Sequence, residues 1–406
     1  MKIYLVGGAI RNQLLDLPLK DKDWLVVGSS SQKMIDLGYK KVGRNFPVFL
    51  HPDTGEEYAL ARTERKISSG YTGFICHASP EVTLEQDLAR RDLTINAIAQ
   101  DQSGKYYDPH GGIIDLQNRK LRHVSSSFYE DPLRVLRVAR FSASLAHLNF
   151  HIVDETLTIM KRMSKNGELC SLPRERIWKE LLAALRTENP DVFFQVLQLC
   201  GSLTVLFPEL NTINSFVSNR HKNSKIQIYL HSPMALSIAA KLTTDIDIRF
   251  SVLLYDLSLA SLRHITWASY DEFNSYRTLL ISSLCMRLSV PHSLRNFAMV
   301  VIKFHHIVDT IQSRSPSELI GLFNKIDAWR KPSRVNKIAL VSEIFSRRNS
   351  DSIDFCYKQS EYLRRAWGLV QNVSTKEILY RGFEGKEIYH ELMRRRISIL
   401  TQWQNI

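Results

Sequence analysis

The spacing of apolar residues changes near residue 125, and this change constrains the fold more than any other feature. Before it, short apolar runs separated by turn residues are typical of strands in a mixed domain. The expected elements there are strands at Lys2–Val6, Asp23–Val27, Phe46–His51 and Glu57–Arg62 and a helix at Ala9–Leu15. After it, residues such as Trp178, Leu181 and Leu185 recur at spacings of three and four, which predicts helices joined by short loops. We therefore expect an α+β fold in which only the first part holds a sheet.

Length and charge point to several packed units and an anionic partner. The chain has 406 residues and a net charge of +13. A single hydrophobic core stops growing at roughly 250–300 residues, so more than one unit is expected. The charge favours nucleic acid as the partner, the alternative being a surface that only aids solubility. It is concentrated late in the chain, since Val301–Ile406 holds 18 basic and 11 acidic residues.

Cysteine usage and hydropathy predict a cytoplasmic protein. The five cysteines are dispersed, which argues against a disulfide framework and against a thiolate zinc site. No window holds the roughly 20 uninterrupted apolar residues that a membrane span requires, so no membrane partner is expected. The apolar start at Ile3–Val6 is too short for the core of a secretory signal.

Two motifs near the start suit phosphate and metal binding. Gly7 and Gly8 separate the first strand from the first helix, and glycines there let backbone amides approach phosphate oxygens, with Arg11 in reach of a triphosphate. The alternative is a tight turn that only requires glycine. Asp21 and Asp23 point to the same face of the next strand, where two carboxylates can share hard divalent ions. The alternative is a solvated strand entrance.

Two further motifs are rich in arginine. Arg90–Ala97 places two arginines before Asp92, which suits a phosphate clamp on a helix, unless Asp92 caps that helix and the arginines are solvated. Glu130–Phe141 starts a second helix, where Asp131 before Pro132 is a sound N-cap. The basic residues of that helix repeat every three positions beside an apolar stripe, which is costly unless an anion meets them. They are Arg134, Arg137 and Arg140.

In order and spacing, these motifs closely resemble those of the CCA-adding enzymes, the bacterial tRNA nucleotidyltransferases related to poly(A) polymerases. The stretches that carry the resemblance are Gly7–Arg11, Asp21–Trp24, Phe46–Pro52, Glu57–Lys66, Arg90–Ala97 and Glu130–Phe141. The resemblance implies a polymerase-β-like nucleotidyltransferase head followed by helical neck, body and tail. The implied bounds are 1–125 for the head, 126–210 for the neck, 211–315 for the body and 316–406 for a basic, tRNA-binding tail.

The resemblance also implies an activity. The 3′-hydroxyl of a tRNA attacks the α-phosphate of CTP or ATP, pyrophosphate leaves, and CMP, CMP and AMP are added without a nucleic-acid template. The implied metal is Mg²⁺, held by Asp21 and Asp23, and the expected assembly is a monomer or a weak homodimer. The residues that match nucleotide-contacting positions of the family are Gly8, Arg11, Arg91, Asp131, Arg134, Arg137 and Arg140.

Within that set, Asp131 and Arg134 match the pair that selects the base. An aspartate accepts a hydrogen bond from an exocyclic amine, and an arginine donates to ring nitrogens or carbonyl oxygens. Cytosine and adenine share that edge, whereas guanine and uracil invert it and leave charged groups unpaired. Glu57 is a candidate third metal carboxylate. The loop Lys66–Pro80, with Ser68, Ser69, Gly70 and Gly73, is a candidate mobile element, the alternative being an ordinary surface loop.

The chain departs from the family pattern in the body. Many long bacterial members carry a phosphohydrolase module there that needs a His–Asp pair and further histidines for a transition metal. Here Tyr255 precedes Asp256, and the next stretch offers only His264 at its edge. His231, His292, His305 and His306 do not sit beside an aspartate. Because phenol is a poor substitute for imidazole, we expect a helical scaffold without phosphohydrolase activity.

Two rival functions remain open from the sequence. A poly(A) polymerase of the same superfamily would add only A and usually has a longer basic extension. A non-catalytic RNA-binding relative would not need both Asp21 and Asp23 together with the arginines. The basic, aromatic clusters of the tail suit an RNA backbone, although each alone reads as a solvated helix face. They are Trp329–Lys331, Arg364–Trp367 and Arg394–Arg396.

Overall fold

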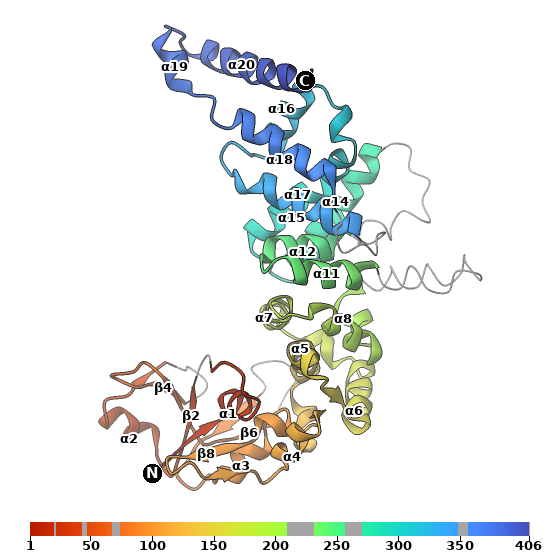
Figure 1. Cartoon of the computed structure of the whole chain (residues 1–406). Coiled ribbons are helices and arrows are strands. Elements are labelled where there is room, and N and C mark those ends of the chain that lie inside the picture. Colours follow the sequence, from red (N-terminus) through yellow and green to blue (C-terminus); the bar gives the residue numbers. More distant parts are fainter. Residues whose placement is uncertain are drawn as a thin grey trace, which may run out of the picture. The chain divides into compact units, whose positions relative to one another are not determined.

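The structure is a computed structural model that describes residues 1–19, 22–42, 47–66, 74–208, 231–255, 270–347 and 356–405. Packing divides the chain into two compact units, Met1–Pro208 and Glu209–Ile406. The first unit contains a sheet and helices, and the second is helical (Figure 1). The expected α+β class, with its sheet confined to the start, is confirmed.

A seven-stranded mixed sheet forms the centre of the first unit, with the order β3-β4-β5-β2-β1-β8-β9. Its long strands are β1 (Lys2–Val6) and β2 (Asp23–Val27), which span the expected residues. They are flanked by β5 (Glu57–Leu60) and β8 (Ala99–Asp101). The shorter strands are β3 (Lys40–Lys41), β4 (Val48–Leu50) and β9 (Tyr106–Tyr107).

The register of three strands places a glycine turn and two carboxylates at one end of the sheet. β1 and β2 are antiparallel and pair Val6 with Asp23. β2 and β5 are parallel and pair Asp23 with Glu57. Since β1 ends where β2 and β5 begin, the turn at Gly7 and both carboxylates lie at that end. Helix α1 (Gly8–Leu14) starts there too, one residue before the expected position.

Both faces of the sheet are buried. On one face, Tyr4 and Leu25 pack against Leu88 of α3 (Leu84–Ala89). On the other face, Val26 and Phe49 pack against Met34 of α2 (Ser31–Asp36). Successive strand residues point to opposite faces, so Leu25 and Val26 enter different cores. A slip of one residue would exchange the two side chains between the cores and misalign each with its packing partners.

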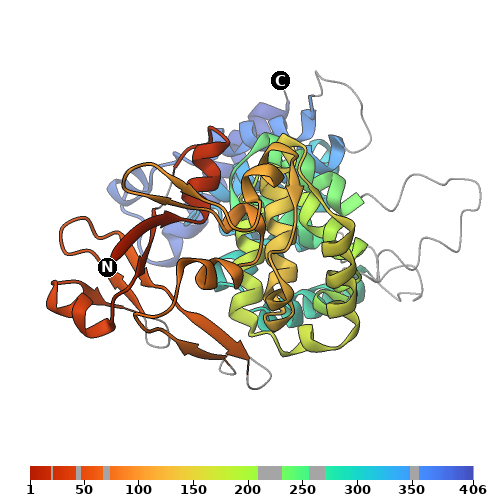
Figure 2. The same ribbon diagram turned by 90° about the horizontal axis from the view of Figure 1, so that it is seen from below.

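Helices complete the first unit and lie beside the sheet (Figures 1 and 2). Helix α5 (Leu133–Leu145) packs against α7 (Arg174–Leu185) and α8 (Pro190–Leu199). The others are α4 (Gly112–Gln117), α6 (Asp154–Lys165) and α9 (Ser202–Leu206). Two short strand pairs lie outside the main sheet: β6 (Thr63–Lys66) with β7 (Phe74–His77), and β10 (Lys120–Leu121) with β11 (His151–Ile152). β11 departs from the purely helical expectation, because two residues are too short to produce a sequence pattern.

The second unit is built from helices around one apolar core. They are α11 (His231–Leu242), α12 (Ile246–Tyr255), α14 (Tyr270–Arg287), α15 (His292–Asp309), α16 (Pro316–Lys325), α17 (Ser333–Arg347), α18 (Lys358–Val370), α19 (Thr375–Tyr380) and α20 (Lys386–Gln404). Phe323 is fully buried, with its ring 5.0 Å from that of Trp367. Arg396 lies 3.3 Å over the ring of Trp329 in the same cluster. None of the helices in the described residues is long and apolar enough to span a bilayer.

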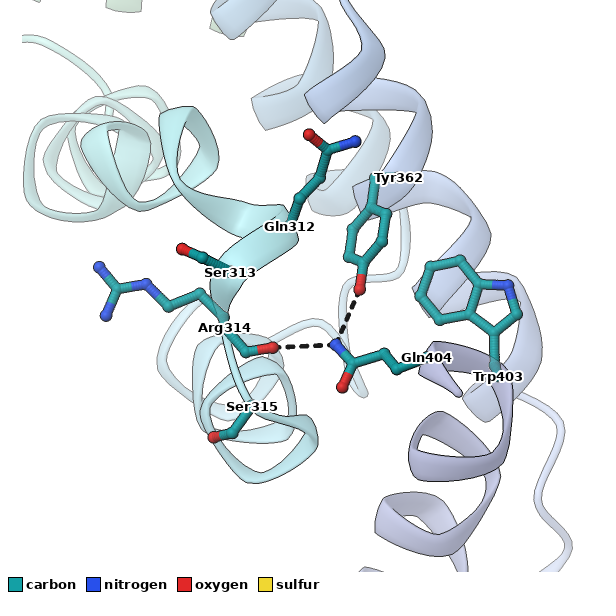
Figure 3. A pocket seen from close by; sticks show the side chains of 7 residues that line it. All are labelled: Gln312, Ser313, Arg314, Ser315, Tyr362, Trp403 and Gln404. Carbon is teal, nitrogen blue, oxygen red and sulfur yellow. Dashed lines mark hydrogen bonds between the residues drawn. The ribbon is translucent and has the colours of Figure 1, made fainter. Parts of the chain in front are cut away.

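One side chain ties the end of α20 to two other elements (Figure 3). Gln404 Nε2 donates to the backbone oxygen of Arg314 at 2.9 Å and to Tyr362 Oη at 2.7 Å. The ring of Trp403 lies 4.5 Å from that of Tyr362. A pocket of about 560 Å³ lies at this junction. The amide thereby links α20 to α18 and to the turn before α16.

The region expected to lack a phosphohydrolase centre is packed around aromatic rings. The ring of Tyr255 lies 4.8 Å from His305 and 4.1 Å from Phe345. Asp256 and His264 lie outside the described residues. Tyr255 is therefore half-buried and packs against the core at α12, α15 and α17.

Replacing Phe323 with alanine tests the core of the second unit. Phe323→Ala should lower the free energy of unfolding by about 3–5 kcal/mol, because it leaves a cavity beside Trp367. Denaturant unfolding followed by tryptophan fluorescence measures this. Tyr380→Ala is the control, since Tyr380 is 94% exposed and its loss should change stability by less than about 0.5 kcal/mol. Equal effects of the two substitutions would contradict the packing described.

Candidate active site

A cavity of about 950 Å³ lies in the first unit. Its walls come from the β1–α1 turn, from β2 and β5, from the segment 90–96 and from α5 and α7. All sequence-predicted site residues within the described part of the chain line this cavity. They are Gly8, Arg11, Asp23, Arg91, Asp131, Arg134, Arg137 and Arg140. Asp21 lies outside the described residues, as do Ser68, Ser69, Gly70 and Gly73 of the candidate mobile loop.

The glycine turn is closely packed against an arginine. Gly7 has φ +71°, a left-handed conformation that favours glycine. A Cβ added there would lie 3.0 Å from Nη1 of Arg91. Arg11, one turn into α1, donates to Asn96 Oδ1 at 2.7 Å. Burial, reinforced by Arg140, lowers the pKa of Arg11 to about 10, so it remains a cation at neutral pH.

The segment Arg90–Ala97 is not the helix that the sequence predicted. Arg90 ends α3, Leu93 is extended and bridges to His123, and only Thr94–Asn96 forms a 3₁₀ turn. The bridge to His123 holds the backbone out of the α conformation. Both arginines are largely buried and ion-paired rather than solvated.

Asp92 does not cap an α-helix but links this segment to α5. Its Oδ1 accepts from the Leu93 N–H at 2.8 Å and from Asn96 Nδ2 at 3.0 Å. Its Oδ2 accepts from Arg137 Nε at 2.7 Å. Burial alone would raise the pKa of Asp92, but Arg137 and these hydrogen bonds outweigh it, so the pKa lies well below its usual range.

At the start of α5, Asp131 is held from two sides. Its Oδ1 accepts from the Leu133 N–H at 3.0 Å, but α5 begins at Leu133 with Pro132 at the N-cap, so Asp131 lies one residue before the N-cap position expected for it. Arg176 of α7 donates to it with both terminal nitrogens, at 2.8 Å to Oδ2 and 3.3 Å to Oδ1. Arg134 is buried and donates to Ser127 Oγ at 3.3 Å and to the backbone oxygen of Arg90.

Further along α5, three guanidinium groups surround one ring. The carbon centres of Arg140, Arg11 and Arg137 lie 4.1, 5.1 and 5.6 Å from the centroid of Phe141. Glu180 of α7 accepts from Arg140 Nε at 2.6 Å and lies 3.8 Å from Arg137. Asp92 raises the pKa of Arg137 above its ordinary value, and Glu180 adds to this effect. Together they outweigh burial, which lowers the pKa.

Sequence reasoning missed the polar face of α7. Arg176, Lys179, Glu180 and Ala183 all line the cavity. Their spacing of three and four places them on one face of the helix, opposite the apolar pattern that predicted it. A polar stripe containing an Arg–Glu pair four residues apart was therefore the available signal. Asp87 and Glu64, which pair with Arg90, were missed as well.

The carboxylates at the sheet end suit a hard cation. Asp23 and Glu57 are register partners on adjacent strands, so their side chains point to the same face, and both are exposed in the cavity. Carboxylate oxygens are the donors that small divalent cations prefer. Within the described residues, which exclude Asp21, no group of three or more metal-binding side chains gathers.

Comparisons with known proteins agree with this geometry. Residues 3–122 match the family model of the poly A polymerase head domain. Residues 149–213 match the model described as "Probable RNA and SrmB-binding site of polymerase A". These matches bear out the resemblance found from the motifs.

Solved structures of similar fold cover almost the whole chain. The Thermotoga maritima CCA-adding enzyme complexed with tRNA has 19% identity and a TM-score of 0.60, covering 98% of this chain and 86% of that one. The Bacillus stearothermophilus CCA-adding enzyme in complex with CTP has 18% identity and a TM-score of 0.60, covering 98% and 89%. An apo CCA-adding enzyme has 19% identity and a TM-score of 0.62, covering 99% and 91%. The chain thus matches the model of the poly A polymerase head domain over residues 3–122 and has the fold of the CCA-adding enzymes of known structure.

Proposed function

We propose that this protein adds the 3′-terminal CCA to tRNA, in maturation and repair, by transferring CMP, CMP and AMP from CTP and ATP. The observation that carries the proposal is the cavity itself. It combines a carboxylate pair at the sheet end, a set of buried arginines and the Asp131–Arg134 pair within one volume of about 950 Å³. The fold and the relatives solved with tRNA and CTP support the same substrates.

The arginines provide a site for the triphosphate. Arg11, Arg137 and Arg140 crowd around Phe141, and Arg91 lies against the Gly7 turn. Crowded cations in a partly desolvated cavity repel one another, and a polyanion relieves that repulsion. Guanidinium groups also match phosphate oxygens with two parallel hydrogen bonds. The triphosphate therefore lies along this wall.

The reaction also needs a metal cation beside the α-phosphate, and the carboxylates at the sheet end are suited to bind it. Asp23, with Asp21 two residues before it, would hold Mg²⁺, and the paired Glu57 completes an oxygen-rich donor set. When bound, Mg²⁺ neutralises the charge that develops on the phosphate oxygens. In the transfer, the 3′-hydroxyl oxygen forms a bond to the α-phosphorus as the bond to the pyrophosphate oxygen breaks, and the hydroxyl proton is released to solvent.

Base selection rests on Asp131 and Arg134. Oδ1 of Asp131 accepts from both Arg176 and the Leu133 N–H, and Oδ2 accepts from Arg176. Oδ2 therefore retains capacity to accept from the exocyclic amine of cytosine or adenine. Arg134 is fixed through Ser127 and the Arg90 backbone, so its remaining N–H groups present a set edge.

The second unit serves as a helical scaffold that binds tRNA. The packing of Tyr255 against His305 and Phe345 supports the expectation that phosphohydrolase activity is absent. The basic surface of the tail favours the RNA backbone. We propose that the protein acts in the cytoplasm as a monomer or a weak homodimer.

Replacing Asp23 with alanine should abolish nucleotide incorporation while tRNA binding stays within about twofold, because the metal site and not the RNA surface is lost. Incorporation is measured on tRNA lacking its CCA end, with CTP alone, ATP alone and both together. Asp36→Ala is the control, since Asp36 is exposed on α2 and should leave incorporation unchanged. Addition of A alone by the intact protein would favour a poly(A) polymerase, and no incorporation would favour a binding protein.

Replacing Arg176 with methionine should weaken the preference for CTP and ATP over UTP and GTP by about tenfold, because Asp131 loses its bidentate partner. Relative kcat/KM values for the four nucleotides measure this. Arg174→Met on the same helix is the matched control, since Arg174 pairs with Glu175 at the surface. An unchanged preference in Arg176→Met would contradict the proposed orientation of Asp131.

Phosphohydrolase activity can be tested directly. The purified protein should not hydrolyse 2′,3′-cyclic AMP and should carry no stoichiometric nickel or manganese, because an aromatic cluster occupies the surroundings of Tyr255. Metal analysis and a cyclic-nucleotide assay measure both. Hydrolysis with bound metal would show that the body keeps a working centre.

A further inference from the structure

A fully buried carboxylate contacts arginines that line the cavity. Asp87 on α3 has no exposed surface and does not line the cavity. Its hydrogen-bond partners include Arg90 and Arg91, which do line the cavity. Its Oδ1 accepts from Arg90 and from the backbone N–H of Arg62, and its Oδ2 accepts from Arg91. One carboxylate thus serves two cavity arginines at once.

The pairing with Arg91 uses one particular edge of the guanidinium. Nε and Nη2 donate to Asp87 Oδ2 at 3.4 and 3.2 Å, and Nη1 donates to the backbone oxygen of Asn96 at 3.3 Å. A guanidinium has five N–H groups. With these partners among the described residues, one N–H on each terminal nitrogen is left for a ligand. These two N–H groups belong to the Nη1 and Nη2 edge of the guanidinium, which can form two parallel bonds to a phosphate.

The environment keeps Asp87 ionised although it is buried. Burial by itself would raise the pKa of Asp87, but Arg90 and Arg91 outweigh it, so the pKa lies below its ordinary value. Glu64 shares Arg90 with it, at 2.9 Å from Nη1. Arg90 is therefore held by two acids, whereas Arg91 has Asp87 as its ion-pair partner. Loss of Asp87 consequently acts chiefly on Arg91.

We propose that Asp87 is a positioning residue of the nucleotide site, which turns the free end of the Arg91 guanidinium toward the triphosphate without touching it. This inference rests on the proposed function, since it assumes that a nucleoside triphosphate fills the cavity. Asp87 holds Arg91 against the Gly7 turn, so the phosphate meets a guanidinium whose orientation is already set. The rotational freedom of that side chain is then lost on folding rather than on binding.

The test is a double-mutant cycle in the full chain with Asp87→Asn and Arg91→Met. Asp87→Asn should raise the KM for CTP about tenfold, the size of one charge-assisted contact, with kcat changed less than about threefold. In the Arg91→Met background the same substitution should change KM less than about twofold, because its intermediary is gone. Dissociation constants for CTP with Mg²⁺, measured by calorimetry, give a readout that does not depend on transfer.

Asp115→Asn is the matched control. Asp115 is also a buried head-domain carboxylate, bonded to Thr94 and Arg122, but it lies outside the cavity lining. It should lower thermal stability and leave the affinity for CTP unchanged. If Asp87→Asn does not fold, Arg91→Lys tests the same point, since lysine keeps the charge but not the fork and should weaken CTP binding similarly.

The outcomes separate the two proposals. Equal affinity for CTP in Asp87→Asn and Asp115→Asn would overturn the inference, as would KM effects that multiply in the double variant. CTP affinity unchanged in Arg91→Lys would overturn it as well. If the intact protein binds CTP but transfers no nucleotide, the proposed function fails while the affinity measurements still decide the role of Asp87.

Discussion

Ion pairs between buried acids and arginines hold the cavity together. Asp87 pairs with Arg90 and Arg91, and Asp92 pairs with Arg137. Glu180 and Asp131 play the same part for the arginines of α5 and α7. Removing Arg90 or Arg91 would leave the fully buried charge of Asp87 short of a partner and would destabilise the fold, whereas the pairs of Arg137 and Arg176 are partly exposed and contribute less. The pairs hold the arginine side chains of the cavity in defined orientations.

The same pairs join segments that are far apart in the chain. Asp92 precedes the 3₁₀ turn Thr94–Asn96, whereas its partner Arg137 lies on α5, and Asp131 is bonded by Arg176 of α7. The sheet and the helices of the first unit thus share the site instead of flanking it. A substitution in α7 can therefore move Asp131.

The sequence was most informative where the pattern is local. The strands Lys2–Val6 and Asp23–Val27 follow from short apolar runs between turns, and the structure has both at those residues. Asp131, expected as the N-cap before Pro132, lies one residue before the observed N-cap and accepts from the first N–H of α5. The described members of the predicted site all line one cavity because each lies in a motif with its own local signature. Their chemical roles stay predictions.

Long-range pairing left no such signal. Arg90–Ala97 was expected to be helical, but the bridge from Leu93 to His123 overrides its local preference. Asp87 was missed because it looks like a solvated helix residue until its partner is known. The polar stripe of α7 that holds Arg176 and Glu180 is visible in the sequence, but it does not show which residues they pair with. Only the three-dimensional contacts distinguish a buried acid that orients an arginine from an ordinary surface charge.

The parallel pairing of β2 with β5 has a consequence for the connection before β5. Asp23 and Glu57 meet because β5 pairs with β2 in this register, and β5 also pairs with β4 across the hairpin between Leu50 and Glu57. A shift of β5 by one residue would turn Tyr58 and Leu60 away from the core that they share with Phe49 and carry Glu57 to the opposite face. A change in the length of that connection is therefore compatible with the site only if it leaves the pairing of β5 with β2 in place.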